Sequence, residues 1–327
     1  MSLITVFGAT GAQGGSVVRQ LLKDPKWKVR GITRDVNSEK SKQLASQVAD
    51  STHCQGVEVI AADLFNVKSL ERAIEGAVGI FLVTLYWEFI GEHGLDGAGE
   101  QEVTQFKNLA LAASKSPTLK HLVLSTLPPA SKSSGGKFKV PHSDYKEKGA
   151  EWIRKNTPEL WAKSSEYWAG FYTSNLWTLP FTKPVKPPQS GAYLFLLPSK
   201  PSATVSLAGD LDTNTGIIVE ALFKAGSKAF DRIAMGTTDL RPISDLAVVY
   251  EKVTRKPTRY VEVSDEIFEA LYGIYGRELA AQMRWSESVT DWENLDPGRV
   301  ISHQELGVEG KLVNFEEALV AARDKLE

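Results

Sequence analysis

Three glycines near the start of the chain are spaced for binding phosphate. Gly8, Gly11 and Gly14 lie at the junction of an apolar run at residues 3–9, which includes Gly8, and an amphipathic pattern at residues 15–24. At a strand-to-helix junction, such glycines permit a tight turn, let backbone N–H groups approach a pyrophosphate and let the helix pack closely on the strand. The pattern therefore predicts a dinucleotide site, and a glycine-rich turn without a ligand is the alternative.

A cation follows the second predicted strand. That strand, at residues 28–34, leads into the stretch GITRDV, which presents Arg34 before Asp35. Sites that prefer NAD usually carry an acid here to bind the ribose hydroxyls, whereas a guanidinium matches a phosphate in a bidentate manner. Arg34 therefore favours NADP(H) over NAD(H), and a surface cation at a strand end is the alternative.

These residues need alternating strands and helices to position them. Strands are predicted at residues 3–9, 28–34, 57–64, 78–85 and 121–127, and helices at residues 15–24, 37–50, 67–77 and 100–116. Such alternation is typical of βαβ units with right-handed crossovers. It predicts an α/β fold built on a doubly wound parallel sheet of the Rossmann type.

The regular alternation ends near residue 127. A loop-like stretch at 128–140 precedes a helix at 144–156, and shorter apolar runs follow. We expect residues 1–155 to form the NAD(P)-binding domain and residues 156–327 to form a smaller α/β substrate or partner lobe, some of whose segments return to the sheet. The glycine-rich stretch YWEFIGEHGLDGAG, at 86–99, is predicted to be a loop that acts as a lid or as a partner surface.

The composition of the 327 residues is that of an ordinary globular protein with a net charge of −2. This charge gives no electrostatic reason to expect direct binding of nucleic acid or of an anionic membrane. The longest apolar run, at 79–91, is too short and too interrupted to cross a bilayer. The single cysteine, Cys54, suits a reducing compartment, so a cytoplasmic location is expected. The five histidines are dispersed, and no metal site is predicted.

Several segments, in order along the chain, carry a family resemblance. They are FGATGAQGGSVVRQLL, VRGITRD, ADLFN, VTLYWEF, EQEVTQFKNLALAA, HLVLSTL, PHSDYKEKGAEWIRK and GFYTSNL. Together they resemble the NmrA-like family, the atypical short-chain dehydrogenases that include fungal nitrogen-metabolite regulators and their animal homologues. The resemblance covers roughly residues 3–260, and related families include isoflavone-reductase-like enzymes and quinone or dye reductases.

By that resemblance, the nucleotide would lie at the carboxyl ends of the strands. The resemblance implies a phosphate loop of Thr10, Gly11, Ala12, Gln13 and Gly14, a 2′-phosphate contact at Arg34, adenine contacts at Asp63 and Leu64, a ribose and pyrophosphate wall at Thr84, Leu85 and Tyr86, and nicotinamide packing at Tyr172 and Asn175. Asp63 has a second interpretation as the N-cap of the helix that follows, and Asn175 as a turn residue.

The catalytic pair of ordinary short-chain dehydrogenases is missing. In Tyr-x-x-x-Lys the lysine lowers the tyrosine pKa, but Tyr145 is followed four residues later by Gly149. Lys146 instead falls where NmrA-like and isoflavone-reductase-like proteins carry an active-site lysine, which would hold the nicotinamide ribose and help to protonate a developing alkoxide. Ser125 falls where a short-chain dehydrogenase orients its substrate, and His142 and Tyr145 are acid–base candidates beside Lys146. The alternative for Lys146 is a solvated cation on its helix, and the alternative for Ser125, His142 and Tyr145 is a structural role.

Aromatic residues are dense between positions 152 and 177, where Trp152, Trp161, Trp168 and Trp177 are joined by Tyr167, Phe171 and Tyr172. They would suit a pocket for a planar or polyketide-like small molecule, and core packing or a homodimer surface explains them equally well. Two functions therefore stay open. One is an NADP(H)-dependent reductase of a carbonyl, imine or conjugated alkene, which the retained Lys146 favours. The other is an NADP(H) sensor acting through a regulatory protein partner, which the missing tyrosine favours.

Overall fold

An eight-stranded parallel sheet forms the centre of the protein. The computed structural model describes residues 1–47 and 56–326, so the single cysteine, Cys54, lies outside the described residues. The strand order is β12-β9-β6-β5-β4-β1-β2-β3. The sheet strands are β1 (Ser2–Val6), β2 (Trp27–Thr33), β3 (Glu58–Ala61), β4 (Gly79–Leu82), β5 (His121–Thr126), β6 (Ser164–Trp168), β9 (Ile233–Met235) and β12 (Val300–Ile301). Because the order reverses between β1 and β4, the prediction of a doubly wound Rossmann sheet is confirmed.

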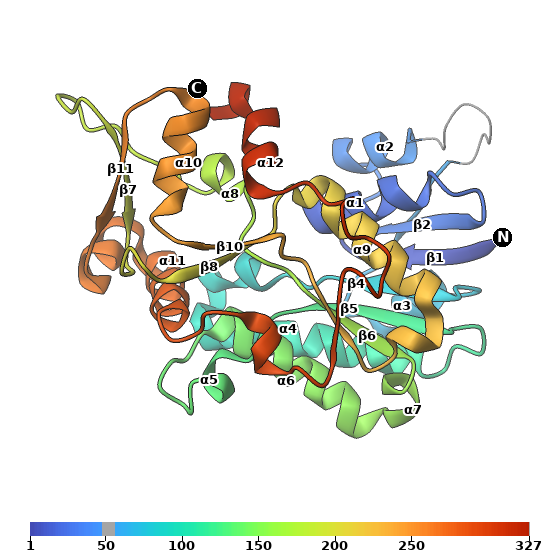
Figure 1. Ribbon diagram of the computed structural model, residues 1–327. Coiled ribbons are helices and arrows are strands. Elements are labelled where there is room, and N and C mark those ends of the chain that lie inside the picture. The colour runs from blue at the N-terminus through green and yellow to red at the C-terminus, as the bar shows by residue number, and fades with distance from the viewer. Residues whose placement is uncertain (48–55, 327) are drawn as a thin grey trace.

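Helices cover both faces of this sheet (Figure 1). They are α1 (Ala12–Leu21), α2 (Glu39–Ala45), α3 (Val67–Ala73), α4 (Tyr86–Ala113), α5 (Ala130–Ser133), α6 (Pro141–Asn156), α7 (Pro158–Trp161) and α9 (Leu211–Ala225). Side chains alternate along β4, where Phe81 packs in the cluster that contains α1 and α9, while Ile80 and Leu82 pack in the cluster that contains α3, α4 and α6. Such strands, buried on both faces, read as continuous apolar runs, which is why the sequence reveals them.

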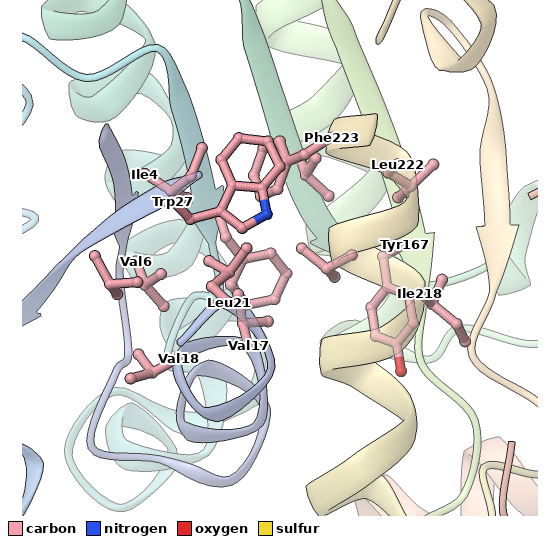
Figure 2. Close-up of a cluster of buried hydrophobic side chains, with 14 of the residues drawn as sticks. Ile4, Val6, Val17, Val18, Leu21, Trp27, Tyr167, Ile218, Leu222 and Phe223 are labelled. Atoms are coloured by element: carbon pink, nitrogen blue, oxygen red, sulfur yellow. The ribbon is translucent and has the colours of Figure 1, made fainter. Parts of the chain in front are cut away.

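Helices α1 and α9 pack against each other on one face of the sheet. Figure 2 shows Val17, Val18 and Leu21 of α1 in the same buried cluster as Ile218 and Leu222 of α9. The backbones come close at Gly216, whose N–H donates to the Ser16 hydroxyl over 2.9 Å. A Cβ atom at position 216 would lie 2.3 Å from the Ser16 carbonyl oxygen, so only glycine allows this approach. The packing therefore links the helix that follows the glycine loop to the second half of the chain.

The second half of the chain contributes to the sheet and also forms a smaller lobe. Strands β6, β9 and β12 extend the sheet beyond β5. The lobe contains two small sheets, in which β7 (Tyr193–Leu197) pairs with β11 (Thr258–Glu262) and β8 (Thr204–Leu207) pairs with β10 (Asp239–Pro242). Its helices are α8 (Asn175–Thr178), α10 (Asp245–Thr254), α11 (Asp265–Ser286) and α12 (Phe315–Ala321), with short 3-10 turns η1 (Gly226–Ala229), η2 (Trp292–Leu295) and η3 (Arg323–Leu326). Side chains of α8, α10, α11, α12, η3 and the two small sheets pack in an apolar core of the lobe, whereas Ala229 of η1 and Trp292 of η2 pack in clusters with strands of the large sheet. The division of the chain at residue 155 stays a prediction.

One sequence prediction of local structure is wrong. Residues 86–99 are not a loop, because α4 begins at Tyr86 and continues to Ala113 with a single non-helical residue, Gly94 (φ 66°, ψ −176°). Gly99 lies against the ring of Tyr145 on α6, and a Cβ there would come within 2.2 Å of that ring. The glycines that made this stretch look like a loop therefore include one that permits close helix packing. No described helix is long and apolar enough to span a bilayer.

Candidate functional site

A cleft of about 650 Å³ opens at the carboxyl ends of β1, β2, β3 and β4. We call it the glycine-loop cleft. Its lining residues are Phe7, Gly8, Thr10, Gly11, Ala12, Gln13, Ile32, Thr33, Arg34, Asp35, Ser38, Lys40, Ala62, Leu64, Val83, Leu85, Trp87, Glu88 and Tyr172. The cleft lies where the strand order reverses, which is where open α/β sheets bind their ligands.

The glycine loop brings backbone into this cleft. Gly8 has φ +68°, which favours glycine, and a Cβ there would lie 2.4 Å from Val83 Cγ1. A Cβ at Gly14 would lie 2.2 Å from the Gly8 carbonyl oxygen, so Gly14 allows α1 to pack on the loop and does not itself line the cleft. Helix α1 begins after Gly11 with no side-chain hydrogen bond to its cap. The first-turn N–H groups therefore meet no capping side chain, and Gly11, Ala12 and Gln13 line the cleft.

Two cations lie at the end of the cleft beside β2. Arg34 follows the last residue of β2, and Lys40 is in the first turn of α2. Between them, Ser38 caps α2 by accepting a hydrogen bond from the Ser41 N–H. The Asp35 carboxylate accepts the Asn37 N–H over 2.8 Å, so a local turn engages this acid. The arrangement supplies positive charge for a phosphate at the predicted position.

Gln13 is held from both sides by hydrogen bonds. Its side-chain oxygen accepts the Ser125 hydroxyl over 2.7 Å, and its side-chain nitrogen donates to the Tyr172 hydroxyl over 2.6 Å. Burial raises the pKa of Tyr172, which keeps this phenol neutral. Ser125 is buried at the end of β5 and does not line the cleft. The bridge thus joins the glycine loop to β5 and to the segment that follows β6.

Lys146 is held in a buried ion pair. Its Nζ lies 2.5 Å from Glu102 Oε1 and donates to the Thr84 hydroxyl over 3.0 Å. The Lys146 side chain is 12% exposed, and that of Glu102 is fully buried. Thr84 also donates to Glu102, over 2.6 Å, and Glu102 Oε2 has no hydrogen-bond partner among the described residues. This pair lies close to the cleft wall at Leu85, because Thr84, which bonds both members of the pair, precedes Leu85 in the chain and Leu85 lines the cleft.

His142 belongs to a second buried pair. Its Nδ1 lies 2.6 Å from Glu278 Oε1, and its backbone N–H donates to the same oxygen over 2.7 Å. The His142 ring packs against Trp87, with ring centroids 5.1 Å apart, and Trp87 lines the cleft. Burial, together with the Glu278 and Glu102 carboxylates, raises the pKa of Tyr86, whose hydroxyl donates to the Leu95 carbonyl. His142 therefore contacts the cleft wall through the Trp87 ring and does not itself line the cleft.

Other predicted site residues have partners away from the cleft. The Tyr145 hydroxyl donates to Asp96 over 3.1 Å, and burial together with Asp96 raises the Tyr145 pKa to about 12. The Asp63 carboxylate accepts the Phe65 N–H, and Asn66 caps α3, so the alternative of Asp63 as the helix cap is wrong. Asn175 begins α8 and does not line the cleft. Among residues 1–47 and 56–326, no group of three or more acids, histidines or cysteines could hold a metal.

The predicted ring-rich pocket does not form from the expected tryptophans. Trp168 is packed in the core with Trp285 and Trp292, and the Trp161 ring contacts the guanidinium groups of Arg154 and Arg299. Rings from other segments instead pack around Trp87, which lines the cleft. Trp87 lies 6.5 Å from Phe181 and 6.4 Å from Tyr275, centroid to centroid, with nearly parallel planes. These rings come from α4, the stretch after α8, and α11.

Comparison with known proteins decides the family. The model of the NmrA-like family matches residues 1–319. The chain belongs to the NmrA-like family. An NmrA-like family domain-containing protein of Dictyostelium discoideum is 29% identical over 329 residues, which cover 99% of each chain. The NmrA-like family domain-containing oxidoreductase FrzB of Cladobotryum sp is 32% identical over 286 residues, which cover 83% of this chain and 80% of that protein.

Solved structures share the NmrA-like fold. NmrA, a negative transcriptional regulator crystallised in complex with NADP, superposes with a TM-score of 0.75 at 21% identity, over 99% of this chain and 95% of that one. The same regulator is also solved with NAD. At this identity the likeness shows the shared fold, including the parallel sheet.

Sequence reasoning missed several residues of this NmrA-like site. Lys40 and Ser38 carried a signal, since they begin the helix that follows Arg34. Glu102 and Glu278 carried only a weak signal, because acids within helical patterns are usually exposed. Their burial results from the packing of α4 and α11 and could not be read from the sequence. Trp87 and Glu88 lay in the stretch predicted to be a loop that acts as a lid or a partner surface, and neither residue was named as part of the site, although both line the cleft.

Proposed function

We propose that this NmrA-like protein binds NADP(H) and is an oxidoreductase that transfers a hydride from NADPH to a carbonyl, imine or conjugated alkene of a small organic molecule. One observation carries the proposal. The uncapped start of α1 opens into a glycine-lined cleft whose far end, beside β2, presents Arg34 and Lys40. Backbone N–H groups and two cations, in a cleft of about 650 Å³, suit a dinucleotide that carries a pyrophosphate and a further phosphate.

The residues present fit such a cofactor. The loop from Gly11 to Gln13 would hold the pyrophosphate, Arg34 and Lys40 would hold the 2′-phosphate, and Leu64 would flank the adenine. Leu85, Trp87 and Tyr172 would border the nicotinamide half. When bound, the cofactor supplies the hydride. The word oxidoreductase in the name of the FrzB relative supports this class of reaction.

Lys146 would act at the proton-handling end of the site. Its ammonium is charge-compensated by Glu102 and oriented by Thr84, so a proton is held at Nζ next to the Leu85 wall. From there it would donate to a ribose hydroxyl or, through water, to oxygen that gains charge as hydride arrives. Tyr145 is a weaker candidate, because its hydroxyl is engaged by Asp96 and its pKa is raised.

A sensor without turnover is the second candidate, and the position of Lys146 favours it. Two acceptors already engage the ammonium, and Lys146 does not line the cleft in this structure. The regulator NmrA, whose fold this chain shares, is crystallised with NADP. A sensor of this kind would need the nucleotide site and a protein partner, and no proton donor. The reductase would act on a small-molecule substrate, and the sensor would act through a regulatory protein partner. We also propose a cytoplasmic location and, as a further possible assembly, a homodimer.

Turnover and binding measured together distinguish the two candidates. NADPH oxidation would be followed by nicotinamide absorbance with a panel of quinones, aldehydes, enones and imines, for the wild type and for Lys146→Met. The reductase predicts turnover that Lys146→Met abolishes while calorimetric NADPH binding persists. The matched control is Lys148→Met on the same helix, whose partner Glu100 is half exposed and lies outside the cleft lining. Binding of NADPH without turnover on any acceptor would contradict the reductase and support the sensor.

A further inference from the structure

The cation that is predicted to bind the 2′-phosphate, Arg34, forms an ion pair with the carboxylate of Glu88. Arg34 Nη1 lies 2.8 Å from Glu88 Oε2, and Arg34 Nη2 donates to Glu88 Oε1 over 3.2 Å. The two contacts form a bidentate fork, the geometry in which a guanidinium would also grip a phosphate. Both side chains line the glycine-loop cleft, although 54 residues separate them in the sequence.

The segment that carries Glu88 is set off from the rest of α4. Residues 86–93 form a short helical piece, and Gly94 interrupts the helix with φ 66° and ψ −176°. Nothing lies within 4 Å of the position of a Cβ on Gly94, so its conformation and not a close contact is what requires glycine there. The Glu88 side chain is 46% exposed, and the Arg34 side chain is 64% exposed. The pair can therefore separate without exposing buried apolar surface.

We propose that Glu88 is a specificity-determining residue, which competes with the cofactor 2′-phosphate for the Arg34 guanidinium and so narrows the preference for NADP(H) over NAD(H). The inference rests on the proposed function. A phosphate monoester and a carboxylate accept from the same two N–H groups of Arg34, and their like charges repel at this range. Binding of a 2′-phosphorylated dinucleotide therefore requires Glu88 to leave Arg34.

The unphosphorylated cofactor, NAD(H), places no second anion beside the Glu88 carboxylate. Its ribose 2′-hydroxyl is a neutral donor, and a carboxylate at a strand end accepts such a hydroxyl in sites that prefer NAD. The Arg34–Glu88 pair can then stay intact. Asp35, the other acid in the cleft lining, is engaged by the Asn37 N–H, which leaves Glu88 as the acid that faces Arg34. Removing the charge of Glu88 should thus act oppositely on the two cofactors.

Calorimetric titrations of wild type and Glu88→Gln with NADPH and with NADH test this. Because exposed ion pairs contribute little and a dianion adds to the repulsion, we expect Glu88→Gln to bind NADPH about three- to tenfold more tightly. NADH should bind no more tightly than to wild type. Adenosine 2′,5′-bisphosphate, a probe without the nicotinamide half, should show the same gain as NADPH. Glu88→Lys should shift the preference further in the same direction.

Glu92→Gln is the matched control, since Glu92 lies one turn further along the same segment, does not line the cleft and is 81% exposed. It makes the same change in net charge and should leave both affinities unchanged. The inference is overturned if Glu88→Gln, melting as the wild type does, leaves the ratio of NADPH to NADH affinity within about twofold of the wild-type ratio or if Glu92→Gln shifts it equally. If the wild type binds neither dinucleotide, the proposed function fails first; if it binds NADPH and the ratio does not move, only the role of Glu88 fails.

Discussion

Replacing Glu102 with Gln removes the negative partner of Lys146 while keeping nearly the same side-chain shape. The pair joins α4 to α6 at 2.5 Å, with Lys146 12% exposed and Glu102 fully buried. At that separation, an effective dielectric constant of about 20 gives a gross attraction of about 7 kcal/mol. Desolvation takes back several kcal/mol for each ion, so the intact pair contributes far less than this to stability.

Breaking the pair is more costly than its net contribution, because one charge stays buried alone. Loss of one partner of a buried pair typically costs about 3–5 kcal/mol. We expect about 3 kcal/mol for Glu102→Gln, since Lys146 keeps the Thr84 hydroxyl and some solvent access. Lys146→Met should cost more, toward about 5 kcal/mol, because the stranded Glu102 carboxylate has no access to solvent. The double variant removes both charges and should be about 2 kcal/mol more stable than Glu102→Gln.

The assay is urea unfolding, followed by the fluorescence of the eight tryptophans and by far-UV circular dichroism. The two probes should give coincident transitions before free energies are compared. The same two helices provide a control in Lys148–Glu100, also 2.5 Å apart but with both side chains 52% exposed. Glu100→Gln should change the free energy of unfolding by less than about 1 kcal/mol. The reasoning is refuted if Glu102→Gln costs no more than Glu100→Gln, or if the double variant is no more stable than Glu102→Gln.

Three further predictions follow from other parts of the molecule. Arg34→Ala should weaken NADPH binding by about 1.5–3 kcal/mol and leave NADH binding nearly unchanged in calorimetric titrations, and an equal loss for both cofactors would contradict the role of Arg34. Gly216→Ala should lower the free energy of unfolding by about 1–3 kcal/mol, because its Cβ would lie 2.3 Å from the Ser16 carbonyl oxygen. Gly91→Ala should not lower it, because a Cβ there would meet only the Tyr275 hydroxyl, at an ordinary contact distance of 3.7 Å, so equal urea midpoints for the two variants would argue against the close approach at Gly216. Burial and the nearby Glu166 carboxylate raise the pKa of Glu147 to about 7, so its stabilising contribution is present below about pH 4.5 and is lost as the pH rises to about 7. Glu147→Gln should therefore flatten the fall of the melting temperature across that range and stabilise the protein by up to about 3 kcal/mol at pH 8, with Glu151→Gln as the exposed control on the same helix.

The sequence by itself determined the features that depend on local periodicity. Continuous apolar runs such as GIFL at 79–82 indicated strands buried on both faces, and the alternation with amphipathic helices indicated the doubly wound sheet. The glycine loop was also predictable, because Gly8 and Gly14 meet neighbours within a few residues or on the adjoining strand. Arg34 at the end of β2 followed from strand position alone.

Only the tertiary structure decided which side chains meet in the site. Gln13 bonds Ser125 and Tyr172, which lie 112 and 159 residues away, and Glu278 reaches His142 across 136 residues. Residues 86–99 form a helix and not a loop, and Gly99 fits there against the Tyr145 ring of α6. Local sequence patterns report periodicity and turn preference, whereas burial of Glu102 and the meeting of Glu88 with Arg34 depend on how distant elements pack.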